Sequence, residues 1–133
     1  MRIRAVSLIA VLLCLIASSA GAQQGHPLDG VWSGDWGPSP TERIPVVLEL
    51  HWKNTTLSGG INPGFPDVAT LEVGRLNSAN WTVHLEAAGK DERGNTVRTV
   101  IDGQIENLGS ANRTLTGTWR QGNVTGNFKL TRE

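Results

Sequence analysis

The side chains best suited to acid–base and nucleophilic chemistry are three histidines and, after residue 22, five serines. A catalytic serine is activated by a histidine and often lies in a Gly-x-Ser-x-Gly turn. None of these serines lies in such a turn or has a histidine nearby in the sequence. His51 and His84 take outward positions on two predicted strands that are not neighbours, and His26 precedes the first strand. The sequence therefore predicts no catalytic centre and a protein that is not an enzyme.

Acidic and thiol side chains add no cofactor or metal chemistry. Asp91 and Glu92 lie between Lys90 and Arg93, a pattern typical of a solvated hairpin tip rather than of an acid pair. Turn and strand-end chemistry explains three further aspartates: Asp29, Asp35 and Asp67. The only cysteine is Cys14, which lies in the N-terminal segment, so the rest of the chain has no thiolate ligand or nucleophile. We expect no metal and no cofactor.

Residues 1–22 have the three parts of a secretory signal peptide. Arg2 and Arg4 form the basic head, residues 6–16 are almost wholly apolar, and residues 20–22 read Ala-Gly-Ala, a small-x-small cleavage site. The sequence thus predicts a secreted or periplasmic protein, with no membrane attachment after the signal is cleaved.

A lipoprotein signal that uses Cys14 is the alternative, but bulky Leu13 stands where such signals have a small residue. After cleavage we predict a flexible lead-in over residues 23–28 and a single domain over residues 29–133, because this length supports only one core. That domain has no cysteine and must be held together by apolar packing alone.

Charge and sequons limit the partners without identifying one. The 12 basic and 12 acidic residues balance, and two of the basic ones lie in the signal, so neither nucleic acid nor an anionic membrane is an expected partner. Four Asn-x-Thr sequons would carry sugars in a eukaryotic secretory path, whereas in a bacterium they would only mark turns. The short, Arg-headed signal favours a bacterial protein.

One five-residue pattern, with glycine between two large apolar residues, occurs five times and points to a barrel. Side chains at i, i+2 and i+4 of a strand share a face, so each copy points two bulky groups inward around a glycine. Glycine lets a strand coil sharply and leaves room for a ring from a facing strand. The copies start at Trp32, Leu57, Ile101, Leu115 and Val124.

Alternating apolar residues and turn signals predict an all-β domain of eight strands. Short links between successive strands favour antiparallel neighbours, so we expect a single eight-stranded up-and-down β-barrel that closes on itself. The predicted strands span residues 30–36, 44–52, 56–61, 69–76, 81–87, 96–106, 114–120 and 124–132.

The connectivity divides the loops between two ends of the barrel. Three of the four loops after odd-numbered strands are long or rich in Pro and Gly, over residues 37–43, 62–68 and 88–94, which predicts an open mouth there and a closed floor opposite. At the mouth we expect a ligand-binding group formed by Trp36, Arg43, Phe65 and Trp119. At the floor we expect a structural group formed by Gly30, Trp32, Trp52, Trp81 and Arg132.

Gly30, Trp32 and Arg132, together with eight meandering strands, resemble the calycin plan shared by lipocalins, fatty-acid-binding proteins and avidins. The resemblance implies that the first and last strands pair and that Arg132 lies beside Trp32 at the barrel floor. Several departures limit what it implies about ligands: the chain has no Tyr for an avidin-like biotin site, no helical pair after the first strand, and no disulfide like that of calycin-type protease inhibitors. The C-terminal segment from Leu115 to Arg132 also resembles small exported bacterial domains with no assigned activity.

Two function classes remain open from the sequence. The first is a binding protein that holds a small, mostly apolar ligand at the mouth, and it predicts a cavity of a few hundred cubic ångströms there. The second is a filled structural or interaction barrel with a protein partner, and it predicts no cavity and an exposed apolar patch on the mouth loops. In that second case the five tryptophans are only core filler.

Overall fold

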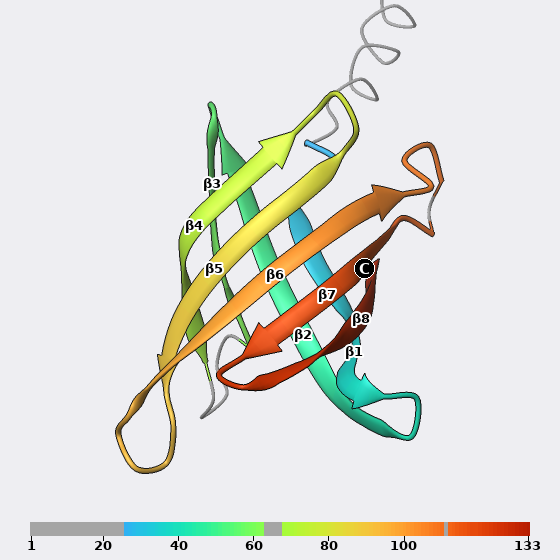
Figure 1. Cartoon of the computed structure of the whole chain (residues 1–133). Helices are drawn as coiled ribbons and strands as arrows, with labels where there is room; N and C mark the ends of the chain where they lie inside the picture. Colours follow the sequence, from blue (N-terminus) through green and yellow to red (C-terminus); the bar gives the residue numbers. More distant parts are fainter. Residues whose placement is uncertain (1–25, 63–67, 111) are drawn as a thin grey trace, which may run out of the picture.

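The computed structural model describes residues 26–62, 68–110 and 112–133 and consists of eight antiparallel strands (Figure 1). The predicted signal peptide, residues 23–25 of the lead-in and Phe65 lie outside the described residues. The described part of the chain contains no helix that is long and apolar enough to cross a membrane. The strands are β1 (Gly30–Ser39), β2 (Glu42–Lys53), β3 (Thr56–Ile61), β4 (Ala69–Asn77), β5 (Thr82–Lys90), β6 (Thr96–Glu106), β7 (Thr114–Gln121) and β8 (Val124–Arg132).

The strands form a closed barrel in sequence order, which confirms the predicted up-and-down topology. Each strand pairs with the next in antiparallel register, and β1 pairs with β8 to close the sheet. In that last pairing Trp32 lies opposite Arg132, as the calycin resemblance implied. Closure pairs the two strands that would otherwise leave unsatisfied backbone groups at a sheet edge.

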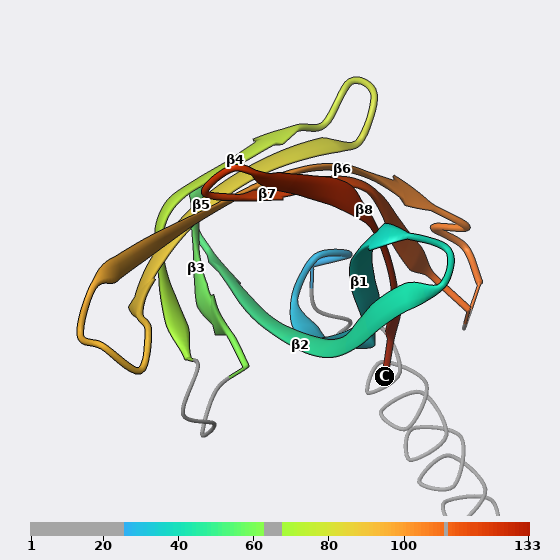
Figure 2. The same cartoon turned by 60° about the horizontal axis from the view of Figure 1, so that its bottom comes forward.

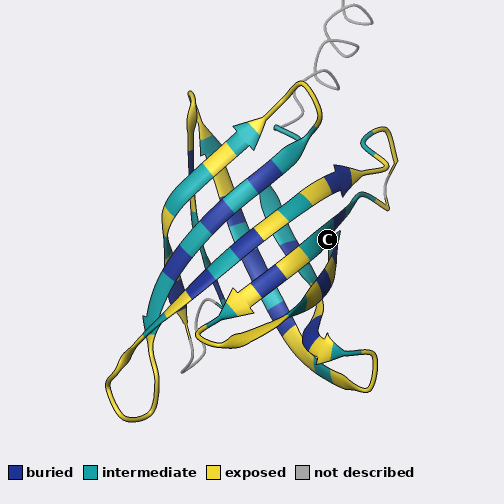
Figure 3. Cartoon of the chain, viewed as in Figure 1, coloured by how far each residue is buried: buried dark blue, intermediate teal, exposed yellow. Residues whose placement is uncertain are grey.

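Alternation along the strands fills the barrel with apolar side chains (Figure 3). In β2 the buried positions are Val46, Leu48 and Leu50, and in β5 they are Val83 and Leu85. Because β2 and β5 bury every second residue over these stretches, a slip of one position would expose the whole buried set, so the pattern fixes their register.

Four of the five repeated glycines leave space for a neighbouring backbone rather than for a ring. A Cβ on Gly117 would stand 2.0 Å from the carbonyl oxygen of Asp102 on β6, a distance that no side chain tolerates. Only Gly103 leaves room for a ring, because a Cβ there would lie 2.9 Å from Cζ of Phe128 on β8, two strands along the sheet. The glycines therefore let adjacent strands approach closely where the barrel coils.

The two ends of the barrel lie where the connectivity predicted, but one of the predicted mouth loops is absent. Figure 2 turns toward the viewer the end at which β1, β3, β5 and β7 finish, which we call the mouth. The expected long loop over residues 37–43 is absent, because β1 continues to Ser39 and β2 already starts at Glu42. Gly37 permits this extension: a Cβ at that position would lie 1.7 Å from the carbonyl oxygen of Glu42.

At the opposite end, the floor, the chain before β1 packs into the barrel. The sequence predicted a flexible lead-in over residues 23–28, but Leu28 is completely buried in the core and Pro27 is held by a hydrogen bond from Arg113. Trp32 Nε1 donates to the carbonyl of Leu28 at 2.9 Å. The described part of the lead-in, residues 26–28, is therefore a plug for the floor, and so short a segment carries no periodic pattern from which to predict it.

Candidate functional site

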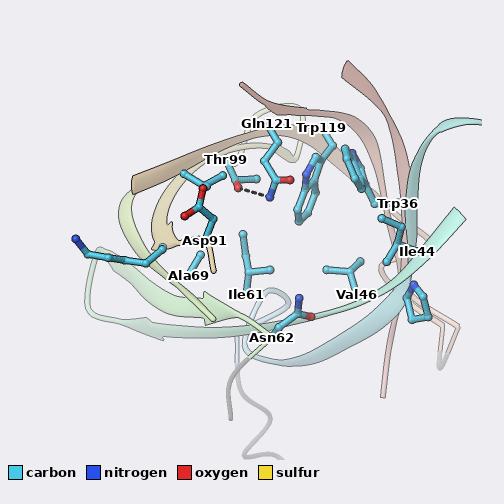
Figure 4. Close-up of a pocket in the computed structure, with 14 residues that line it drawn as sticks. Trp36, Ile44, Val46, Ile61, Asn62, Ala69, Asp91, Thr99, Trp119 and Gln121 are labelled. Atoms are coloured by element: carbon cyan, nitrogen blue, oxygen red, sulfur yellow. Dashed lines mark hydrogen bonds between the residues drawn. The ribbon is translucent and has the colours of Figure 1, made fainter. Parts of the chain in front are cut away.

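A cavity of about 230 Å³ lies at the mouth end of the barrel (Figure 4). Its position follows from the topology, because the mouth-side ends of seven strands contribute its wall. Ile44, one of the lining residues, is 55% exposed, so the cavity is continuous with solvent at the rim. The lining residues are Trp36, Ile44, Pro45, Val46, Ile61, Asn62, Ala69, Gly89, Lys90, Asp91, Val97, Thr99, Trp119 and Gln121.

Two tryptophans form one side of this cavity. The rings of Trp36 and Trp119 lie 5.5 Å apart between centroids and are tilted by 43°, and Phe128 packs edge-on against Trp119 at 6.1 Å. The two tryptophans are 8% and 3% exposed, and neither Nε1 has a hydrogen-bond partner among the described residues. Their position at the mouth follows the strand order, and their rings give the cavity a rigid apolar wall.

A polar pair faces the same space. Thr99 is the one buried polar residue in the described part of the chain, and its Oγ1 accepts a hydrogen bond from Gln121 Nε2 at 3.0 Å (Figure 4). Thr99 and Gln121 occupy inward-facing positions on the paired strands β6 and β7. Sequence reasoning missed both, although the inward parity of Thr99, two residues before buried Ile101, was a readable signal.

Charge is scarce in this wall. Among the described residues Lys90 and Asp91 are the charged lining residues, and both are exposed at the rim. The Asp91 carboxylate accepts hydrogen bonds from the backbone N–H groups of Arg93 and Asn95 at 2.9 and 2.8 Å, which close the β5–β6 turn. This confirms the predicted hairpin tip and leaves Asp91 with a structural role.

Arg43, the polar contact expected from the sequence, lies outside the cavity. Its guanidinium binds Oδ1 of Asp35 at 2.6 Å and Oδ1 of Asn127, also at 2.6 Å. These partners come from outward-facing positions of β1 and β8, so Arg43 ties three strands together on the outer surface. The structure thus corrects the sequence-based assignment: Arg43 is a clamp on the barrel wall rather than a lining residue.

Two of the expected floor residues, Trp52 and Trp81, lie against a histidine that was not assigned to the floor. The His26 ring stacks on Trp52 with centroids 4.4 Å apart and lies 6.1 Å from Trp81. Burial there lowers the pKa of His26, because desolvation disfavours the imidazolium form. Arg132 Nε donates to the carbonyl of Asp29 at 2.8 Å, directly over Gly30, where a Cβ would meet the guanidinium.

The outward-facing His84 is not the isolated imidazole that the sequence suggested. Its Nδ1 lies 2.5 Å from Asp102 and its Nε2 lies 3.0 Å from Glu86, so carboxylates on β5 and β6 flank the ring. The hydrogen bonds with Asp102 and then Glu86 raise the pKa of His84. In the described ranges no three side chains are grouped so that they could hold a metal ion.

Comparison with protein-family models, with curated proteins and with solved structures finds no match for this chain. The closed antiparallel barrel of eight strands is consistent with a calycin-like plan.

Proposed function

We propose that this chain is an exported, non-enzymatic binding protein that holds a small, mostly apolar ligand in the mouth of its barrel. The cavity of about 230 Å³ between Trp36 and the opposite wall supports this function most strongly. Well-packed cores contain few voids larger than a water molecule, so an apolar hollow of this size calls for an occupant.

The lining suits such a ligand. Tryptophan rings offer a large, rigid surface, and Val46, Ile61 and Ala69 add aliphatic contacts from β2, β3 and β4. Transfer of a ligand from water to this wall gains about 25 cal/mol for each square ångström of apolar surface buried. The strands that carry these residues are closed into a barrel, so the site is largely preformed and the ordering cost of binding stays small.

One observation favours a second function, docking of a protein partner. Three large apolar side chains are exposed in the described part of the chain, and each lies at the mouth. Ile44 and Val124 are 55% and 46% exposed near the starts of β2 and β8, and Val68 is 42% exposed just before β4. A partner could cover this rim whether or not the cavity is occupied.

A cavity-filling substitution tests the binding function. Ala69 is buried in the cavity wall, so Ala69→Leu should take up part of the empty volume and reduce affinity for a small apolar probe such as propylbenzene at least tenfold. The thermal midpoint should stay within a few degrees of the parent or rise. Binding is measured by calorimetry and by tryptophan fluorescence on residues 23–133.

Ala88→Leu is the matched control, because Ala88 faces outward on β5 beside inward-facing Ala87. This control should bind the probe as the parent does. Equal affinity in the parent and in Ala69→Leu would contradict binding in this cavity. No binding by the parent, combined with capture of a partner that Ile44→Ser abolishes, would favour the second function.

A further inference from the structure

We propose that the ligand is electrically neutral and carries one hydrogen-bonding group, which the Thr99–Gln121 pair recognises. This inference rests on the proposed function and specifies the chemical class of the ligand. Its basis is the contrast between a hydrogen-bonding pair set among apolar groups and the lack of an inward-placed cation among the described residues of the cavity wall.

The pair has hydrogen-bonding capacity to spare. A threonine hydroxyl donates once and accepts twice, and a glutamine amide both donates and accepts. The bond between them uses one proton of Gln121 Nε2 and one lone pair of Thr99 Oγ1, and neither side chain makes another hydrogen bond to the described residues. The Thr99 hydroxyl proton and the Gln121 carbonyl oxygen therefore remain for a ligand, which can satisfy them with a hydroxyl, a carbonyl or an amide.

Burial makes this capacity selective. Thr99 is 1% exposed, so its hydroxyl has little access to water and gains most from a hydrogen bond to a ligand. A ligand without a polar atom would leave the pair as it is, whereas one with a matching group adds one or two hydrogen bonds in a low-dielectric site. The pair thus favours an amphipathic ligand over a pure hydrocarbon of the same size.

A charged ligand fits this wall badly. A carboxylate beside Thr99 would lose its hydration without meeting a cation, because the guanidinium of Arg43 is held outside by Asp35. The ammonium of Lys90 is exposed at the rim next to Asp91, where an ion pair gains little. An ammonium ligand would likewise meet the Asp91 carboxylate only at the exposed rim, where an ion pair gains little.

The volume limits the size of the ligand. A cavity of 150 Å³ lined by aliphatic and aromatic groups holds one benzene molecule, so about 230 Å³ corresponds to roughly ten non-hydrogen atoms. The class is therefore a neutral alcohol, ketone or amide with an apolar body of medium length or one ring.

The test compares 1-octanol, octanoate and propylbenzene, which are similar in size and differ in polarity and charge. Each is titrated at pH 7.5 into residues 23–133 and followed by calorimetry. We expect octanol to bind at least tenfold more tightly than octanoate. Thr99→Val, which keeps the side-chain shape, should weaken octanol binding about three- to tenfold and leave propylbenzene binding unchanged.

Thr118→Val is the matched control, since Thr118 is exposed on the outer face of β7; it should change neither affinity. Octanoate binding as tight as octanol binding would overturn the inference of a neutral ligand while leaving the binding function intact. An equal loss of octanol and propylbenzene in Thr99→Val would overturn the role of the pair. If no probe binds the parent, the proposed function fails, and the inference fails with it.

Discussion

The two ends of the barrel are built from the same kinds of residue and finished differently. At the floor the indole N–H of Trp32 donates to the carbonyl of Leu28, and the segment before β1 fills the remaining space. At the mouth Trp36 and Trp119 have no partner for their Nε1 atoms among the described residues, and a cavity lies beside them. One end is thus completed by the chain itself, and the other is left incomplete.

This difference between the two ends bears on stability and on the proposed function in opposite ways. A buried donor without a partner costs about 1–3 kcal/mol, and an apolar hollow forgoes packing contacts that a filled core would make. At the floor, by contrast, Leu28 fills the core and the indole of Trp32 has its acceptor, although Nε of Arg113 has no partner among the described residues. The retained defects at the mouth therefore coincide with the proposed ligand site, as expected where stability is exchanged for binding.

The largest effect should come from removing the floor plug. Leu28 is fully buried, so Leu28→Ala should lower the free energy of unfolding by about 2–5 kcal/mol, measured by urea denaturation. Val124→Ala at the mouth rim is the control and should cost less than about 0.5 kcal/mol, because Val124 is 46% exposed. A cost below about 1 kcal/mol for Leu28→Ala would show that the segment before β1 is not part of the folded core.

A smaller effect should distinguish the two kinds of tryptophan. Trp32→Phe and Trp119→Phe remove the same atoms from nearly equally buried sites, but only the first breaks a hydrogen bond. Trp32→Phe should therefore cost about 1–3 kcal/mol more in unfolding free energy, since it leaves the Leu28 carbonyl without its donor. Equal costs in the two variants would contradict the contrast between a hydrogen-bonded indole at the floor and an indole without a partner at the mouth.

The sequence predicts features that depend on local interactions, and it does not predict features that depend on long-range packing. The strands and their pairing came from local alternation and turns, and the Trp32–Arg132 pairing then followed from closure of the barrel. The floor plug could not be predicted, because Leu28 is one apolar residue whose burial depends on space that eight other segments leave open. Local patterns specify periodic elements, whereas the filling of an end is a tertiary property.

The mouth shows the same limit at the level of single side chains. Trp36 and Trp119 could be placed there from strand order alone. Arg43 was misplaced because it was assigned to a mouth loop over residues 37–43, whereas it lies in β2, and its partner Asn127 lies 84 residues away. Thr99 and Gln121 were missed because two polar residues on separate strands have meaning only once β6 and β7 are paired.

The smallest effect should be a pair of opposite pH dependences, one from the floor and one from the outer wall. Burial against Trp52 lowers the pKa of His26, so the fold favours its neutral form. That contribution is fully present above the unfolded value of about 6.5 and is lost as pH falls through the lower folded pKa. Asp102 and Glu86 raise the pKa of His84, so its contribution is present below about pH 6.5 and is lost as pH rises through the higher folded pKa.

Urea denaturation from pH 5 to pH 8 of the parent, His26→Gln and His84→Gln measures both contributions. The free energy of unfolding of the parent minus that of His26→Gln should rise with pH. The corresponding difference between the parent and His84→Gln should fall with pH. Salt should weaken only the second dependence, because the His84 ion pairs are partly exposed whereas the His26 effect comes from desolvation. If His26→Gln instead showed the same sign as His84→Gln, the imidazole at the floor would be stabilised in its charged form by Asp29, and the floor would be a wet, ionic closure rather than an apolar one.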